Sequence, residues 1–227
     1  MPRPTNTKER RRQIVRALIK VMAERGYERA SVAEIARAAD LTPGLLHYHF
    51  ESKQEILLAL VDQMANDLDQ RVWVRLEQAG DDPRAQLDAF IDGHLAVVPD
   101  EGAALAACWV AAGAEAIRQP EVRAAWGRIV AASIRRLEKL VKAAMPRDAA
   151  AGVTPAAIAQ SIYASIQGYL VLVASAPDEA HPRTAAAAVR RTAGALLHAA
   201  PGLRTMRLSR DDIDPAAIEA ARKRDPD

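Results

Sequence analysis

The sequence predicts an all-α fold of about nine helices. Half of its 227 residues are hydrophobic, only 4% are aromatic, and glycine is scarce beside abundant alanine. This composition favours helix over sheet. No segment alternates between apolar and polar residues as a half-buried strand does. Apolar residues instead recur at helical spacing between breaks that contain proline or glycine.

The first four helices have clear start and stop signals. We expect residues 1–7 to be disordered and the first helix to cover residues 8–25, with Gly26 at its end. Two S-x-x-E capping boxes begin the second and the fourth helix. A capping threonine followed by proline begins a short third helix between them. These signals are Ser31 with Glu34, Ser52 with Glu55, and Thr42 with Pro43. The fourth helix continues to about Ala79.

Five more helices follow an interruption at residues 80–83. The breaks between them contain proline, and glycine marks two of them. The expected ranges are 83–98, 102–118, 120–145, 155–175 and 183–200. The last part, residues 201–227, reads as a charged C-terminal tail.

The distribution of charge and the single cysteine limit the class of protein. The net charge is +2, and it divides into +4 for residues 1–55 and −2 for the remainder, which favours a polyanionic partner at the N-terminal end. Cys108 alone cannot form an internal disulfide, so a reducing compartment fits. We find no signal peptide, and the apolar run at 161–177 is short for a membrane span. We therefore expect a cytoplasmic protein with no membrane partner.

Residues 31–53 are the most informative segment, because they read as two helices joined by a tight turn. The side chains of Leu41, Leu46 and Phe50 would anchor the short third helix to the first two. The outer surface would then carry Thr42, Pro43, Gly44, Leu45, His47, Tyr48 and His49. A helix-turn-helix places such a surface in the major groove of DNA.

Several of these residue types suit contact with DNA. Thr42 and Tyr48 can donate hydrogen bonds to phosphate oxygens, and Leu45 can touch a thymine methyl. Gly44 allows a close backbone approach. Lys53 combines an ammonium charge with the free N–H groups of a helix start, which favours a phosphate. We therefore expect double-stranded DNA to be the partner of this segment.

Residues 14–57 resemble the DNA-binding domain of the tetracycline-repressor (TetR) family. The motifs that carry the resemblance are Gly26-Tyr27, Ser31-Val32-Ala33-Glu34-Ile35-Ala36, Leu41-Thr42-Pro43-Gly44-Leu45-Leu46, His47-Tyr48-His49-Phe50 and Ser52-Lys53-Gln54-Glu55-Ile56. The chain departs from the family at Asp40, where glycine is usual, and at His47, where tyrosine is usual. Asp tolerates the left-handed turn conformation. The resemblance also implies that Ser31, which caps the second helix, faces DNA.

A weaker resemblance covers residues 109–123, which are similar to the C-terminal domain of the betaine-pathway repressor subgroup. The family resemblance implies a DNA-binding domain at residues 1–52 and an effector-binding and dimerisation domain at 53–200. It implies a homodimer on a palindromic operator, with helices 155–175 and 183–200 at the dimer interface, and a small-molecule effector. Candidate effector contacts are the polar and aromatic residues on the apolar faces: His94, Cys108, Trp109, Glu115, Trp126, Tyr163, Gln167 and Tyr169.

Other interpretations remain open at several positions. The basic run at residues 8–12 is either a solvated helix face or a phosphate contact, and Arg3 belongs either to a disordered arm or to a minor-groove arm. Each candidate effector residue can be ordinary core, and Glu115 can pair with an arginine. A metal pair of His47 and His49 is disfavoured because i, i+2 positions point apart on a helix.

We find no catalytic motif, so we expect a regulator rather than an enzyme, with no cofactor and no metal. The alternative is a DNA-binding regulator or activator of the same fold without an effector.

Overall fold

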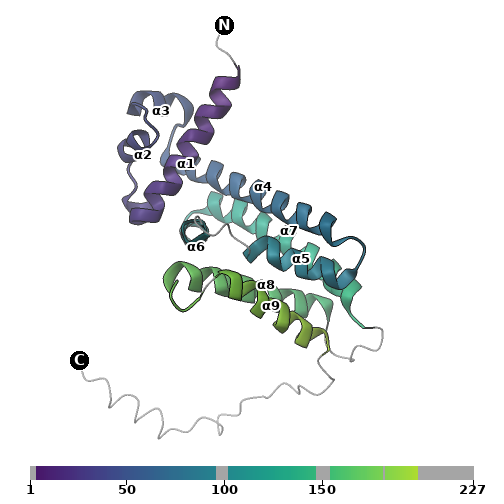
Figure 1. Cartoon of the computed structure of the whole chain (residues 1–227). Helices are drawn as coiled ribbons and strands as arrows, with labels where there is room; N and C mark the ends of the chain where they lie inside the picture. The colour runs from purple at the N-terminus through teal and green to yellow at the C-terminus, as the bar shows by residue number, and fades with distance from the viewer. Residues whose placement is uncertain (1–3, 96–101, 147–153, 181, 199–227) are drawn as a thin grey trace, which may run out of the picture.

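The computed structural model describes residues 4–95, 102–146, 154–180 and 182–198, and in these ranges the regular structure is entirely helical. The helices of the first half are α1 (Pro4–Arg29), α2 (Val32–Ala38), α3 (Pro43–His49) and α4 (Lys53–Ala79). Those of the second half are α5 (Pro83–Leu95), α6 (Gly102–Arg118), α7 (Pro120–Ala144), α8 (Pro155–Ser175) and α9 (Pro182–Leu197). The predicted fold class and order of elements are therefore confirmed (Figure 1).

The first helix begins earlier than predicted, and its regular backbone is broken at Gly26, where its end was predicted. It begins at Pro4 instead of after Thr7, so the expected disorder is wrong for residues 4–7. Proline is compatible with a helix start because its fixed φ suits the first turn. At the other end Gly26 has φ 76° and ψ 166°, a kink after which the helix continues to Arg29. Arg3 and the tail at 201–227 lie outside the described residues.

The predicted capping signals form, although one is incomplete. Ser31 and Glu34 make both hydrogen bonds of a capping box. Ser52 accepts from the Glu55 backbone N–H at 3.1 Å, but the Glu55 carboxylate accepts from the Glu51 N–H instead of returning to Ser52. Asp40 has φ 53°, the left-handed conformation expected of the turn.

The helix α4 belongs to both halves of the molecule. Figure 1 shows it leaving the α1–α3 unit and running along the bundle of α5–α9, where it packs against α5 and α7. Its first turns bury Ile56 and Leu57, and its middle buries Met64 and Leu68 in the same continuous core. Because each fully buried Leu or Ile side chain contributes about 1.5–3 kcal/mol, both the first turns and the middle of α4 are held firmly in the core.

Candidate nucleic-acid interface and effector cavity

Helix α3 has one buried edge and one open face, as predicted. Leu46 and Phe50 are buried, whereas Leu45 is 41% exposed and Tyr48 is 76% exposed. The open face also carries Thr42, Pro43, Gly44 and His47. A Cβ atom added to Gly44 would meet nothing within 4 Å, so this surface has room for a partner that approaches the backbone.

His49 lies differently from its prediction, because it is only partly exposed. Its ring stands edge-on to Tyr48, with 5.1 Å between centroids, and its Nδ1 atom is buried without a partner in the described residues. Burial and the charges of Arg11 and Arg10 lower the pKa of His49. His49 therefore belongs to the edge of the open face and is a neutral group at neutral pH.

The capping residues Thr42 and Ser31 differ in whether the O–H donor of the side chain remains free. The Thr42 Oγ1 atom accepts from the Leu45 N–H at 3.2 Å, so its own O–H remains available as a donor. The Ser31 O–H donates to the Glu34 carboxylate at 2.8 Å. Ser31 can thus act on a ligand mainly by fixing the start of α2.

Lys53, the first residue of α4, is held against the end of α1. Its Nζ atom donates to the carbonyls of Tyr27 at 3.0 Å and Glu28 at 3.3 Å, and it lies 4.3 Å from the centroid of the Tyr27 ring. An ammonium group has three donors, so one remains for a further acceptor. Lys53 therefore joins the start of α4 to the end of α1, where carbonyls attract a cation.

Arg11 is an important residue that sequence reasoning did not single out. Its guanidinium donates to the His49 carbonyl, pairs with Glu55 at 2.9 Å and lies 3.8 Å from the centroid of the Phe50 ring. It thereby ties α1 to the end of α3 and the start of α4. Its neighbours in the basic run have local partners: Arg12 pairs with Glu9, and Arg10 donates to Gln13.

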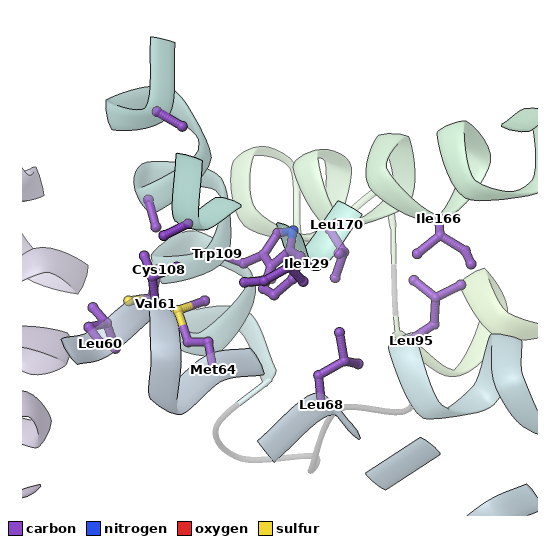
Figure 2. Packing of buried hydrophobic residues seen from close by; sticks show 14 of the residues in the cluster. Leu60, Val61, Met64, Leu68, Leu95, Cys108, Trp109, Ile129, Ile166 and Leu170 are labelled. Carbon is purple, nitrogen blue, oxygen red and sulfur yellow. The ribbon is translucent and has the colours of Figure 1, made fainter. Parts of the chain in front are cut away.

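The C-terminal bundle contains a cavity of about 50 Å³ between α4, α5, α6 and α8. Figure 2 shows Met64, Leu68, Trp109 and Leu170 directed toward this space. The full lining is Met64, Asp67, Leu68, Arg71, His94, Leu105, Ala106, Trp109 and Leu170. Of the eight predicted effector residues, the cavity is lined by His94 and Trp109.

His94 is the most deeply buried polar group of the lining, with 6% of its surface exposed. Its Nδ1 lies 3.0 Å from the Phe90 carbonyl oxygen, whereas Nε2 has no partner in the described residues. Burial lowers the pKa of His94 to about 4, although the bond to Phe90 opposes this shift. The imidazole is therefore neutral, and because a carbonyl only accepts, Nδ1 carries the proton and Nε2 is a bare acceptor.

Three further predicted residues form a layer behind the lining. Gln167 Oε1 accepts from the Trp109 indole N–H at 2.8 Å, and Trp126 packs against Trp109 with ring centroids 4.4 Å apart. Tyr163 stands edge-on to His94 at 6.1 Å. Burial raises the pKa of Tyr163 to about 12. These side chains orient the two residues that line the cavity.

The other three predicted effector residues lie outside the lining. Glu115 is buried and accepts from Gln119 at 2.9 Å, with Arg118 at 3.8 Å, which is the arginine pairing left open above. Cys108 is buried in the core, and burial raises its pKa to about 12. Tyr169 is partly buried against the core.

Asp67 and Arg71 line the cavity but were not predicted, because charged residues of a long helix are usually solvated. The described residues contain no group of three or more His, Cys, Asp or Glu side chains that could hold a metal ion.

Comparisons with known proteins agree for both halves of the chain. Residues 14–60 match the family of bacterial regulatory proteins, tetR family, and residues 83–198 match the C-terminal domain of BetI-type transcriptional repressors. The HTH-type transcriptional regulator BetI of Stenotrophomonas maltophilia is 34% identical over 122 residues, which cover 54% of this chain and 62% of that protein. BetI 2 of Chromohalobacter salexigens is 29% identical over 158 residues, which cover 67% and 76%.

The match to the first of these relatives therefore spans about three fifths of its length. Among solved structures, a transcriptional regulator from Saccharomonospora viridis in complex with choline superposes with a TM-score of 0.72 at 19% identity, covering 81% of this chain and 95% of that one. At this identity the likeness establishes the fold. The relatives are transcriptional regulators rather than enzymes. The chain therefore belongs to the tetR family of bacterial transcriptional regulators and has a C-terminal domain of the BetI type.

Proposed function

We propose that the protein is a homodimeric, ligand-responsive repressor that binds a palindromic operator and is released by a small molecule held in the cavity. The observation that carries the proposal is the open face of α3, where Tyr48 is 76% exposed on a helix whose other edge is fully buried. Burying a large aromatic ring against a partner is favourable, and the Arg11 contacts hold the helix rigidly enough to present it.

The proposed DNA contacts follow from the free groups of this face. The Thr42 O–H and the Tyr48 phenol donate to phosphates, and Leu45 meets a thymine methyl. Pro43, Gly44 and His47 lie on the same face, and His49 lies at its edge. Lys53 offers its third N–H, together with the first backbone N–H groups of α4, to a phosphate. Ser31 acts through the cap of α2.

The dimer is supported by the outer face of α8. While the inner face of α8 is buried in the bundle, the outer face has exposed small and apolar residues at three- and four-residue spacing: Ala157, Ser161, Ala164, Gly168, Val171 and Leu172. The Ser161 hydroxyl donates to the carbonyl of Ala157 in its own helix, so it needs no outside partner. By length and composition alone α8 could also cross a membrane. One face of α8 is already buried in the helical bundle, so a second copy of this chain is the better partner for its outer face.

Helix α9 contributes less free surface than its alanine content indicates. A Cβ atom on Gly194 would lie 3.2 Å from the Arg84 guanidinium, which donates to the Arg190 carbonyl. This part of the small-residue surface of α9 is therefore occupied within the chain. In the proposed dimer, α8 supplies the larger part of the interface, and the exposed side of α9 adds to it.

Helix α4 is the proposed route from cavity to DNA. Asp67 lines both the cavity and a second, open groove between α4 and α1. A cavity of about 50 Å³ is far below the size of usual ligand sites, roughly 300–1,000 Å³, so a ligand must displace the surrounding side chains or helices to enter. A ligand that prefers the moved state shifts the equilibrium away from the DNA-binding spacing.

Choline, with which the Saccharomonospora viridis regulator forms a complex, is one effector to test. The second candidate function is a regulator of the same fold without an effector. For it we expect no metabolite to raise the melting temperature of the protein or to change operator binding.

The proposal is tested by titrating the purified protein against DNA from its own upstream region, with fluorescence anisotropy at two salt concentrations. We expect sequence-selective binding of two protomers per palindrome, with an affinity that falls as salt rises. Binding of one protomer per duplex would contradict the proposed dimeric repressor. It would also be contradicted if every tested upstream segment bound no more tightly than scrambled DNA of the same length.

A further inference from the structure

We propose that the effector is an amphipathic carboxylic acid whose carboxylate pairs with Arg71 and whose hydrocarbon part fills the apolar remainder of the cavity. This inference rests on the proposed effector site and specifies the class of ligand that it selects. The cavity differs from an aromatic cage for a quaternary ammonium compound, because Trp109 is the one Trp, Tyr or Phe residue of its described lining.

Arg71 is the cationic side chain of the lining. Burial lowers its pKa, and the charge of Asp67, one helical turn earlier, opposes this shift. Its Nε donates weakly to the Gly93 carbonyl at 3.4 Å, and no described carboxylate oxygen forms an ion pair with it. By contrast, Arg84 pairs with Asp88, and Arg190 pairs with Asp92. A half-buried guanidinium without a carboxylate is suited to a carboxylate ligand, because its planar fork can donate two parallel hydrogen bonds.

The other charged residue of the lining, Asp67, does not reverse this preference. It lies one helical turn before Arg71 and is exposed to solvent. It also lines the neighbouring open groove, and no described ion pair joins it to Arg71, so its charge is directed to solvent. Of the two charged residues of the lining, Arg71 is the less exposed, so the charge nearer the enclosed part of the cavity is positive.

The neutral polar groups around the cavity also fit such a ligand. The Trp109 indole N–H only donates, so the Gln167 atom 2.8 Å away is the amide oxygen, and the Gln167 NH₂ group is left without a described partner. This leaves a second buried donor behind Trp109. His94 contributes no charge, and its unpartnered Nε2 can accept from a ligand hydroxyl or from water.

The remaining lining is apolar, with Met64, Leu68, Leu105, Ala106, Trp109 and Leu170. A ligand that is charged at one end and hydrocarbon elsewhere would match both parts of this wall. Methionine and leucine side chains can change rotamers to admit such a chain, whereas a wholly polar acid would leave this apolar surface uncovered.

The test uses the full chain and three probes with the same six-carbon chain: hexanoate, hexan-1-ol and hexyltrimethylammonium. Affinities are measured by isothermal titration calorimetry at one pH and one ionic strength. We expect hexanoate to bind at least tenfold more tightly than hexan-1-ol, and hexyltrimethylammonium to bind more weakly than either. Binding of the ammonium compound as tight as that of hexanoate would overturn the proposal.

Two variants test whether Arg71 causes the preference for hexanoate over hexan-1-ol. Arg71→Gln should abolish the advantage of hexanoate over hexan-1-ol. Arg75→Gln, one turn further along α4 and outside the cavity lining, should keep it. Full acid affinity in the folded Arg71→Gln protein, checked by circular dichroism, would refute the role of Arg71.

A separate measurement distinguishes failure of this inference from failure of the proposed function. Operator binding without ligand is measured for the wild type and both variants. If operator binding is tight and selective but no straight-chain acid of four to twelve carbons binds, the carboxylate inference is wrong and the repressor function stands. If acids bind but do not release DNA, the cavity has the proposed chemistry and the proposed effector-controlled release is wrong.

Discussion

At the scale of single residues, Leu46 and Tyr48 lie two positions apart in α3 and have opposite surroundings. Leu46 is buried in the core of the N-terminal unit, and Tyr48 makes no hydrogen bond in the described residues and is 76% exposed. An exposed side chain without a hydrogen bond contributes little to folding, and the one described ring contact of Tyr48 is with its neighbour His49. The exposure of the Tyr48 ring is therefore best explained by contact with a partner, and a substitution tests this explanation directly.

Tyr48→Ala should weaken operator binding at least tenfold, because it removes both a phosphate donor and a large contact surface. The free energy of unfolding should change by less than about 0.5 kcal/mol. Anisotropy titration and urea unfolding measure the two effects. Ile117→Ala is the matched control, since Ile117 is 74% exposed at the end of α6, and it should leave operator affinity unchanged. Unaltered affinity in Tyr48→Ala would remove this residue from the interface.

His94 gives a prediction about pH, because its pKa in the folded chain, about 4, lies below the usual value of 6.5. Between these two values the unfolded chain binds more protons than the folded chain, so stability falls as the pH falls from 6.5 to 4. His94 alone should account for a loss of up to about 3 kcal/mol across this window.

Urea unfolding at fixed protein concentration between pH 7.5 and pH 4 measures this effect. His94→Leu should show a shallower loss of stability than the wild type, with a remaining slope from His49, whose pKa is also lowered by burial. The exposed His47→Gln variant serves as a control with the wild-type slope. An unchanged slope in His94→Leu would mean that His94 is not the buried neutral group described here.

At the scale of elements, the packing of α4 on α5 depends on a glycine. A Cβ atom added to Gly93 would lie 2.7 Å from Val72 Cγ2 and 3.0 Å from the Val72 Cα. Because one of these atoms is backbone, the helices themselves must separate, which costs about 1–3 kcal/mol in a packed core. Gly93 also supplies the carbonyl that Arg71 meets, so this crossing fixes one wall of the cavity.

Gly93→Ala should therefore lower the free energy of unfolding by about 1–3 kcal/mol. Gly127→Ala in α7 is the matched control, since a Cβ atom there would meet nothing within 4 Å. It should raise stability by about 0.5–1 kcal/mol, because alanine is the better helix residue. Urea unfolding of both variants gives the comparison, and equal effects of the two substitutions would refute the close crossing.

Local signals explain why the elements were predictable from sequence. Caps, prolines and helix-ending residues act within four residues, so Ser31, Thr42 and Pro155 begin helices where expected. The outward orientation of Tyr48 followed from helical periodicity in the same way. The contacts of Arg11 and Lys53 could not be predicted, because each bridges segments more than 20 residues apart.

The cavity was only partly predictable for the same reason. Polar and aromatic residues on apolar faces were a usable signal, and it identified His94 and Trp109. It also selected Glu115, whose partners Arg118 and Gln119 follow it on the same helix or just beyond its end. Arg71 was missed because a charged residue on a long helix resembles a solvated one until neighbouring helices are placed.

At the scale of the whole molecule, α4 makes the position of α3 depend on the bundle. The N-terminal unit is tied to the bundle by Lys53 at the start of α4, by the Gln54 contact with Glu121 at 3.1 Å, and by the ion pair of Arg118 with Glu28. These contacts join α1, α4, α6 and α7 beside one another (Figure 1). A displacement of α4 or α6 around the cavity would therefore move the N-terminal unit as a rigid body. This movement changes the distance between two α3 helices on DNA only if a second protomer holds the other one in place.

The outer face of α8 is where that second protomer is expected. Leu172→Glu places a charge on the 47% exposed Leu172 side chain, which the monomer tolerates because the position is open to solvent. In a dimer interface the same charge would be buried without a partner. We expect the variant to elute as a folded monomer by size-exclusion chromatography with light scattering. Its affinity for a palindromic operator should fall by about 10²-fold or more, because two linked half-sites reinforce each other.

Trp73→Glu is the control for this prediction, since Trp73 is 59% exposed on α4 and does not belong to the α8 surface. It should remain dimeric and bind the operator as the wild type does. If Trp73→Glu dissociates the dimer and Leu172→Glu does not, the subunits meet through α4. The α3 helices of the two protomers would then be held by the same helix that lines the cavity. A ligand would act on the interface directly rather than through a fixed second protomer.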